Sequence, residues 1–250
     1  MDLDEKSLEG KTGLVTGASS GIGKAICRVL ADKKVDLGLV ARDEEKLKKL
    51  SEELKDDYSI ETSVLPTDVR NDVQVKKSVE KMIGRFDKID MMVNNAGVIR
   101  YGEIETFSTK DYKTMMETNC DGMFYFTRET IPHLKKSKGN LIFIGSFDAN
   151  NPRSFNPIYA ASKWWTKGFA HSIESIVGDS GVAVTLINPS EVRTSIKSKE
   201  GEKYKDKFEK EEVLDPEEVA KAVLFAVSQE ESSNVSQIDL YRRDKMSEFF

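Results

Sequence analysis

A tyrosine and a lysine four positions apart carry the clearest chemistry in this chain. Tyr159 and Lys163 belong to the segment Tyr-Ala-Ala-Ser-Lys, and in a helix this spacing places both side chains on one face, one turn apart. The lysine charge favours the phenolate and lowers the tyrosine pKa from about 10 toward neutrality, where a general acid or base works best. Ser146 lies upstream and can hydrogen-bond the same substrate oxygen. Alone, such a pair also occurs on solvated helix faces, so its meaning depends on what accompanies it.

A glycine-rich turn follows the first apolar run of the chain. Residues 13–16 lead into Gly17-Ala18-Ser19-Ser20-Gly21-Ile22-Gly23 and then into a helical pattern. Glycines let the backbone turn sharply and approach a pyrophosphate, while the helix N-terminus supplies free N–H groups and a positive dipole end. The alternative is a tight turn without a ligand. The cofactor contacts predicted here are Gly17, Ser19, Ser20, Gly21, Ile22 and Gly23.

If the glycine-rich turn binds a dinucleotide, the residues that follow the second expected strand (36–40) determine whether NADP or NAD is preferred. Arg42 is one of them, and its planar donor fork can pair with a 2′-phosphate. Asp43 follows directly, and an acid there can instead hold the ribose hydroxyl of NAD. The alternative for Arg42 is a surface charge. We predict NADP as the cofactor, with NAD as the second choice.

Short apolar runs alternate with longer amphipathic stretches along the whole chain. Strands are expected at residues 13–16, 36–40, 62–65, 91–94, 141–145, 183–188 and 237–241. Helices are expected at residues 21–33, 44–55, 71–86, 110–137, 158–178 and 216–229. This alternation predicts an α/β fold: one doubly wound Rossmann-type domain over residues 1–250, with a seven-stranded, mostly parallel sheet and helices on both faces.

Composition narrows the class of protein. The chain has 250 residues, 38% of them apolar, and a net charge of −5; this predicts a core of ordinary size and argues against nucleic acid as a partner. Without a long apolar run or an apolar leader, we expect a soluble cytoplasmic protein with no membrane partner. Cys27 and Cys120 are expected to be buried free thiols. His133 and His171 lack ligand spacing, so no metal site is predicted.

Three further segments invite interpretation. Residues 194–214 are dense in Lys and Glu and predict a lid on the substrate side, with a solvated or disordered segment as the alternative. Residues 242–250 form a C-terminal tail that either docks on a neighbouring subunit or frays. Trp164 and Trp165 cannot both face inward, so one is expected in the core and the other at a subunit interface.

Several motifs occur in a recognisable order. They are Thr16 to Gly23 after the first strand, Asp68-Val69 after the third, Asn94-Asn95-Ala96-Gly97 after the fourth, Asn119 in the next helix, Ser146 after the fifth, and Tyr159 with Lys163. Over nearly its whole length the chain resembles the short-chain dehydrogenase/reductase family, in its single-domain oxidoreductase branch.

The resemblance implies a mechanism and its residues. Tyr159 would be the acid/base, Ser146 would hold the reacting oxygen, and Lys163 would lower the tyrosine pKa and bind the nicotinamide ribose. Asn119 would bind a water that relays protons from Lys163. The cofactor would carry the hydride between nicotinamide and the substrate carbon.

The resemblance also assigns the rest of the cofactor site. Asp68 and Val69 would form the adenine pocket, and Asn94 would lie near the adenosine ribose. Independently of the resemblance, we expect Asp68 also to cap the next helix and Asn94 also to form a turn at the sheet end. The remaining implied cofactor contacts are Ala96, Gly97, Tyr159, Lys163, Pro189, Val192 and Thr194. Two departures stand out: the usual Pro-Gly is Pro189-Ser190, and Ser20 replaces a basic residue common in NADP-binding members. Arg42 would therefore determine the phosphate preference largely alone.

The expected substrate pocket contains Ser146, Tyr159, Arg153, Phe155 and Ser190. The predicted activity is NADP(H)-dependent interconversion of a secondary alcohol and a ketone. Alternatives are an NAD(H)-preferring alcohol, polyol or hydroxysteroid dehydrogenase, a nucleotide-sugar epimerase or dehydratase, and a non-catalytic cofactor-binding scaffold. The resemblance implies a homodimer or homotetramer acting on a small molecule.

Overall fold

Seven strands form one sheet. The computed structural model describes residues 7–152, 156–193 and 213–243. The strands are β1 (Thr12–Thr16), β2 (Asp36–Ala41), β3 (Thr62–Pro66), β4 (Met91–Asn94), β5 (Asn140–Ile144), β6 (Ala183–Pro189) and β7 (Gln237–Leu240). Their order is β3-β2-β1-β4-β5-β6-β7, and every pairing between them is parallel. The predicted doubly wound fold is confirmed, and within the described chain the sheet is wholly parallel.

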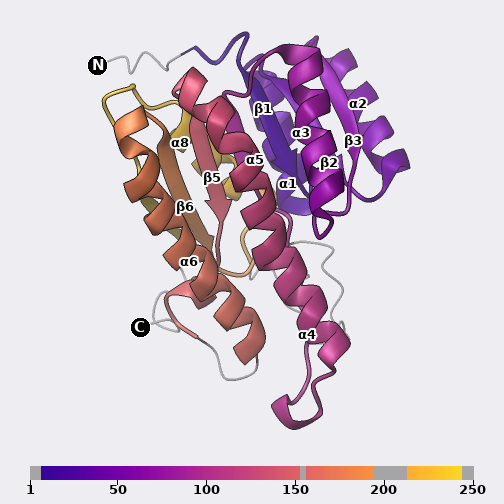
Figure 1. Cartoon of the computed structure of the whole chain (residues 1–250), viewed down its shortest axis with the longest axis vertical. Coiled ribbons are helices and arrows are strands. Elements are labelled where there is room, and N and C mark those ends of the chain that lie inside the picture. Colours follow the sequence, from indigo (N-terminus) through magenta and orange to yellow (C-terminus); the bar gives the residue numbers. More distant parts are fainter. Residues whose placement is uncertain (1–6, 153–155, 194–212, 244–250) are drawn as a thin grey trace.

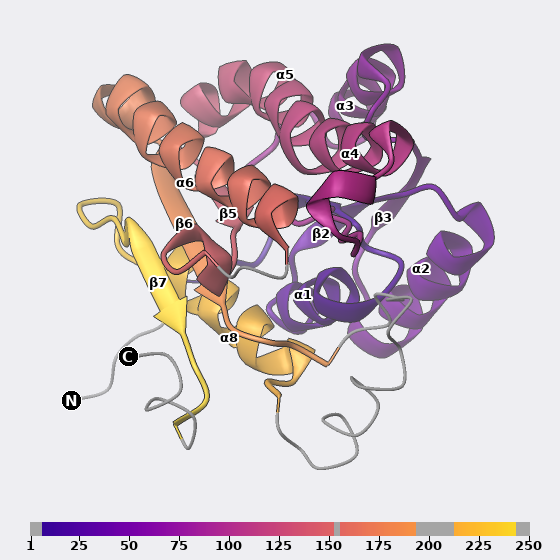
Figure 2. The same cartoon turned by 90° about the horizontal axis from the view of Figure 1, so that it is seen from below.

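Helices cover both faces of this sheet. The longer helices are α1 (Gly21–Asp32), α2 (Glu44–Tyr58), α3 (Asp72–Phe86), α4 (Thr109–Met116), α5 (Gly122–Ser137), α6 (Pro157–Val177) and α8 (Pro216–Val227). Figure 2 shows α1, α2 and α8 on one face and α3, α5 and α6 on the other. In Figure 1, α4 projects beyond the sheet. No helix in the described ranges is long and apolar enough to cross a membrane.

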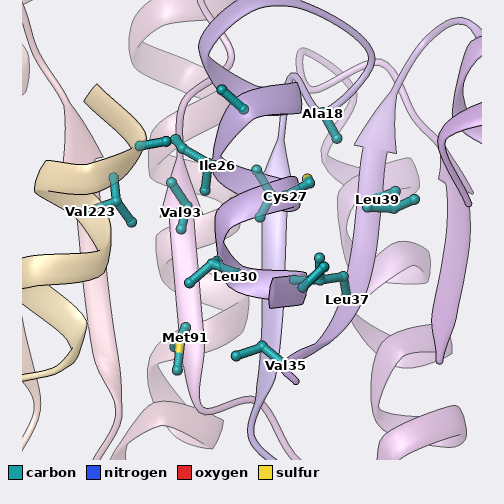
Figure 3. Packing of buried hydrophobic residues seen from close by; sticks show 14 of the residues in the cluster. Ala18, Ile26, Cys27, Leu30, Val35, Leu37, Leu39, Met91, Val93 and Val223 are labelled. Carbon is teal, nitrogen blue, oxygen red and sulfur yellow. The ribbon is translucent and has the colours of Figure 1, made fainter. Parts of the chain in front are cut away.

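The sheet separates two apolar cores. Along β1, Val15 packs beneath α1 while its neighbour Leu14 packs on the opposite face, as the two-residue period of a strand requires. Figure 3 shows Ile26 and Leu30 of α1 lying over this sheet. On the other face, the fully buried Phe126 of α5 belongs to the second core. Burial on both faces explains why the central strands β4 and β5 are nearly continuous apolar runs.

The helix expected over residues 110–137 is wrong in one respect. It is divided by a π-helical turn, η2 (Glu117–Asp121), which separates α4 from α5. A π turn takes up one extra residue, and such turns are frequent at functional sites. The apolar pattern continues through the turn, so periodicity alone does not reveal it. The turn contains Asn119, whose side chain is fully buried.

Local sequence signals account for the helices that border the site. At the start of α6, the Asn156 side chain accepts from the Tyr159 N–H at 3.2 Å, and Pro157 occupies the first helical position. At the start of α8, Glu218 accepts from the Asp215 N–H at 2.8 Å. The Asn156 cap and Pro157 place Tyr159 in the first turn of α6.

The structure also describes the two cysteines and the two tryptophans. Cys27 and Cys120 are buried free thiols. Trp165 stacks on Phe169 with ring centroids 4.6 Å apart and packs against the core, whereas Trp164 is 49% exposed. Trp165 is therefore partly buried against the core, on the inward side as expected for one of the two. The interface role of Trp164 stays a prediction.

Candidate active site

A cavity of about 540 Å³ opens at the carboxyl ends of the strands. This edge of a doubly wound sheet, beside the switch in strand order between β1 and β4, is where such folds bind ligands. The predicted site residues that line it are Gly17, Ser19, Ser20, Gly21, Ile22, Arg42, Asp68, Val69, Ala96, Gly97, Ser146, Tyr159, Lys163, Pro189, Ser190 and Val192. Predicted residues from six strand ends and α6 thus meet at one cavity.

Six predicted residues do not join that lining. Gly23, Asn94 and Asn119 lie behind the cavity wall. Arg153, Phe155 and Thr194 fall outside the described residues, as do most of the expected lid (194–212) and most of the tail (244–250).

The ends of the expected lid segment are anchored beside the site. Leu214 pairs with Val192 in a parallel bridge, and the Arg193 N–H donates to the Leu214 carbonyl at 2.8 Å. Val213 lines the cavity. The chain therefore leaves the site at Arg193 and returns to it at Val213.

Lys163 is held beneath Tyr159. Its Nζ donates to the Ile144 carbonyl at the end of β5 at 2.9 Å and lies 5.6 Å from the centroid of the Tyr159 ring. Burial lowers the pKa of Lys163 from 10.5 to about 8, an effect that the nearby Cys120 and Asp148 partly oppose. The lysine therefore keeps its charge at neutral pH, close to the point at which it can release a proton.

Ser146 is positioned from two directions. Its Oγ accepts from the Asp148 N–H at 3.1 Å and lies 3.3 Å from Asp148 Oδ2, and its own N–H donates to Asn188 Oδ1 at 3.2 Å. A Cβ on Gly145 would lie 2.1 Å from that same Asn188 oxygen. Sequence reasoning included Asp148 in the pocket only as part of the loop 147–155 and assigned no role to it or to Asn188. The only available signals were an asparagine beside Pro189 and an acid two residues after the candidate serine.

Asn119 acts on the loop after β4. Its Oδ1 accepts from the Val98 N–H at 2.8 Å, and its Nδ2 donates to the Val98 carbonyl at 3.0 Å and to Ser162 Oγ at 3.1 Å. A Cβ on Gly97 would lie 3.5 Å from Asn119 Oδ1 and 3.9 Å from Lys163 Nζ. Asn119 thus joins this loop to α6 next to the lysine, while its proton-relay role stays a prediction.

The glycine-rich turn has the geometry of an anion-binding loop. Gly17 and Gly21 have φ values of +68° and +51°, which favour glycine. A Cβ on Gly23 would lie 2.2 Å from the Gly17 carbonyl oxygen, so Gly23 allows α1 to pack against the turn. Ser20 makes no side-chain capping bond, and the first turn of α1 carries no acid. The N-terminal N–H groups of α1 are therefore available to a bound phosphate.

Thr16 and Asn95 join the glycine turn to the loop after β4. Thr16 Oγ1 accepts from the N–H groups of Asn95 and Ala96 at 2.9 and 3.0 Å, and Asn95 Nδ2 donates to the Thr16 carbonyl at 2.7 Å. Asn95 lines the cavity, whereas Asn94 is buried and donates to Thr127 Oγ1 at 3.1 Å. Of the two adjacent asparagines, sequence reasoning selected the one that faces away from the cavity.

At the far end of the cavity, Asp43 has a structural task. One carboxylate oxygen accepts from the Lys46 N–H at 3.1 Å as the cap of α2, and the other pairs with Lys46 Nζ at 3.0 Å. These hydrogen bonds lower the pKa of Asp43. Arg42 lies at the cavity with an exposed side chain. The acid that complicated the cofactor prediction is therefore engaged with its own helix.

Asp68 does not cap a helix, so that expectation is wrong. Asn71 caps α3, accepting from the Gln74 N–H at 3.0 Å; the helix thus begins three residues later than a cap at Asp68 would require. Arg70 Nε instead donates to Asp68 Oδ1 at 2.9 Å. This hydrogen bond holds the pKa of Asp68 below its usual value, against the smaller effect of burial.

Comparison with known proteins agrees with this geometry. The short chain dehydrogenase family model matches residues 11–205. The chain belongs to this family of oxidoreductases. An uncharacterised oxidoreductase of Staphylococcus haemolyticus is 30% identical over 232 residues, covering 92% of this chain and 96% of the relative.

Two solved structures share the fold closely. An alcohol dehydrogenase of the archaeon Thermococcus sibiricus, complexed with 5-hydroxy-NADP, has a TM-score of 0.84 and 26% identity, covering 92% of this chain and 95% of its own. A 3-ketoacyl-(acyl-carrier-protein) reductase of Brucella melitensis, complexed with NADH, has a TM-score of 0.83 and 25% identity, covering 94% and 98%. One of these two structures thus holds an NADP derivative and the other holds NADH.

Proposed function

We propose that this protein is an NADP(H)-dependent oxidoreductase that interconverts a secondary alcohol and a ketone. The observation that carries the proposal is the meeting of Tyr159, Lys163 and Ser146 at one cavity with the glycine-rich turn. A phosphate-binding loop and a proton-transfer group that share one cavity fit a reaction in which a dinucleotide and a small carbonyl compound lie side by side.

The residues divide the work of carbonyl reduction. The bound nicotinamide supplies the hydride to the carbonyl carbon. Tyr159 gives its phenolic proton to the carbonyl oxygen, and Ser146 donates a hydrogen bond to the same oxygen as negative charge develops there. The charged Lys163 beneath the ring, 5.6 Å from its centroid, stabilises the phenolate that remains. Alcohol oxidation uses the same groups in reverse.

The preference for NADP rests on the two neighbours at the end of β2. A 2′-phosphate needs an accessible cation, and Arg42 is exposed at the cavity. A ribose 2′-hydroxyl needs a carboxylate; Asp43 also lines the cavity, but both of its oxygens already interact with Lys46, which favours Arg42 as the group that meets the cofactor. The Thermococcus neighbour with an NADP derivative supports this choice. The Brucella neighbour with NADH keeps the NAD-preferring dehydrogenase as the second candidate.

Cofactor titration with matched variants tests the proposal. We expect the wild type to bind NADPH at least ~10-fold more tightly than NADH, and Arg42→Leu to reduce that ratio at least ~10-fold. Arg85→Leu is the control, because Arg85 is an exposed arginine of α3 that pairs with Glu61 away from the cavity. A wild-type preference for NADH would overturn the NADP proposal in favour of the second candidate.

A Tyr159→Phe variant tests the catalytic part. It should lower kcat for ketone reduction by about 10²–10⁴-fold while NADPH still binds. Full turnover in this variant would refute the role of Tyr159. Cofactor binding by the wild type without turnover of any ketone or alcohol would favour the scaffold alternative.

Self-association is also part of the proposal. Phe124 of α5 is 40% exposed and Trp164 of α6 is 49% exposed, and large exposed aromatic side chains are typical of subunit interfaces. We expect a homodimer or homotetramer by analytical ultracentrifugation. A monomer at micromolar concentration would contradict this part.

A further inference from the structure

A buried carboxylate lies beside the serine that holds the reacting oxygen. Asp148 belongs to the short turn η3 (Phe147–Ala149), which directly follows β5. Only 3% of the residue is exposed, yet it lines the cavity together with Ser146 and Tyr159. Its charge also influences Lys163. The hydride-transfer chemistry described above assigns no task to this acid.

The Ser146 hydroxyl has a single proton to donate. Without substrate, that proton lies between Ser146 Oγ and Asp148 Oδ2, which are 3.3 Å apart, while the serine oxygen accepts from the Asp148 N–H. When Ser146 donates to a substrate carbonyl, Asp148 Oδ2 loses this donor. A carboxylate oxygen only accepts hydrogen bonds, so Asp148 Oδ2 can then accept from a donor on a bound ligand in place of the serine.

A hydroxyl on the carbon next to the carbonyl can replace the lost donor. The serine and aspartate oxygens lie side by side at hydrogen-bond spacing, as do two oxygens carried on adjacent carbon atoms. The carbonyl oxygen then accepts from Ser146 while the neighbouring hydroxyl donates to Asp148. A carboxylate at that substrate position would instead be repelled, which disfavours 2-keto acids.

We infer that Asp148 determines substrate specificity, selecting α-hydroxyketones and the corresponding vicinal diols. This inference rests on the proposed oxidoreductase function, which it deepens by naming a substrate class.

The experiment compares three ketones that differ at one group. 3-Hydroxybutan-2-one, its methyl ether 3-methoxybutan-2-one, and butan-2-one are reduced with NADPH or NADH, and kcat/KM is measured for each. We expect the wild type to prefer the hydroxyketone over both others by about 10–100-fold, since only the hydroxyl donates to a charged acceptor. The ether keeps the oxygen but lacks the proton, so this arm needs no variant.

Asp148→Asn then assigns the preference to the carboxylate. It keeps the shape but removes the charge, and we expect the ratio of hydroxyketone to butan-2-one kcat/KM to fall at least ~10-fold. Asp179→Asn, in the exposed turn η4 (Gly178–Ser180), is the matched control and should keep the wild-type ratio. NADPH titration verifies that each variant folds.

The outcomes separate the two proposals. Equal wild-type kcat/KM for the three ketones, or an unchanged ratio in Asp148→Asn, would overturn the role of Asp148 and leave the oxidoreductase proposal standing. Failure of the wild type to reduce any of them, or any wider set of ketones, would refute the proposed function and this inference with it.

Discussion

Burial of the charged Lys163 should make the free energy of unfolding increase as the pH rises and the lysine loses its proton. Its pKa falls from 10.5 to about 8 on folding because the ammonium group is buried. Between these values the unfolded chain binds more protons than the folded one, so the free energy of unfolding increases with pH. At 1.36 kcal/mol per pKa unit, the full effect is about 3 kcal/mol, of which about 2 kcal/mol develops between pH 6.5 and pH 9.5.

Urea denaturation, monitored by tryptophan fluorescence, gives the free energy of unfolding of two variants at two pH values. The quantity of interest is the difference between the variants in how much this free energy changes with pH. Tyr159→Phe serves as the background, since it removes the phenol whose titration would interfere with that of the lysine. From pH 6.5 to pH 9.5, the background should gain about 2 kcal/mol of unfolding free energy relative to the same protein with Lys163→Met. All samples are held at one protein concentration, because oligomers shift the apparent stability.

A neighbouring lysine provides the control. Lys167 lies one turn further along α6, is only partly buried and donates to Asn150. Introducing Lys167→Met into the same background should leave the pH dependence of unfolding nearly unchanged. A Lys163→Met difference that is flat between pH 6.5 and pH 9.5, or one of opposite sign, would refute the idea that burial of this charge dominates its pKa.

Two further substitutions test the backbone packing and the buried hydrogen bonds around the site. Gly23→Ala should raise the Kd for NADPH at least ~100-fold by fluorescence titration, because its Cβ would lie 2.2 Å from the Gly17 carbonyl oxygen. Gly84→Ala, whose Cβ would meet nothing within 4 Å, should bind normally. Asn188→Leu should lower the free energy of unfolding by about 2–4 kcal/mol in urea, since it orphans the buried Ser146 N–H; an unchanged midpoint would contradict that role.

Much of the fold was predictable because local and tertiary signals agree. The central strands β1, β4 and β5 are buried on both faces and contain short apolar runs, and Asp215 and Pro216 mark the start of α8. The placing of Tyr159 and Lys163 on one face of α6 at the cavity was predictable because their spacing matches one helical turn. The π turn at Asn119 was not, because inserting one residue leaves the surrounding apolar pattern intact.

The sequence did not show which of two adjacent polar residues faces the cavity. Asn94 and Asn95 differ by one position, but the strand ends between them, so one faces the core and the other the cavity. Arg42 and Asp43 pose the same problem. The acid turns into the helix that it caps, and this was visible in the sequence only as an Asp followed by two glutamates.

The side chains to which we assign the chemistry are held by backbone and amide partners from three different strand ends. Lys163 is tied to the end of β5, Ser146 to Asn188 on β6, and Asn119 to Val98 in the loop after β4. These strands are neighbours in the sheet although they are far apart in sequence. Because these partners belong to the folded chain itself, they hold the side chains in fixed positions, which reduces the reorganisation needed when charge develops on a substrate oxygen. A substitution that shifts one strand end should therefore alter catalysis without touching any reactive side chain.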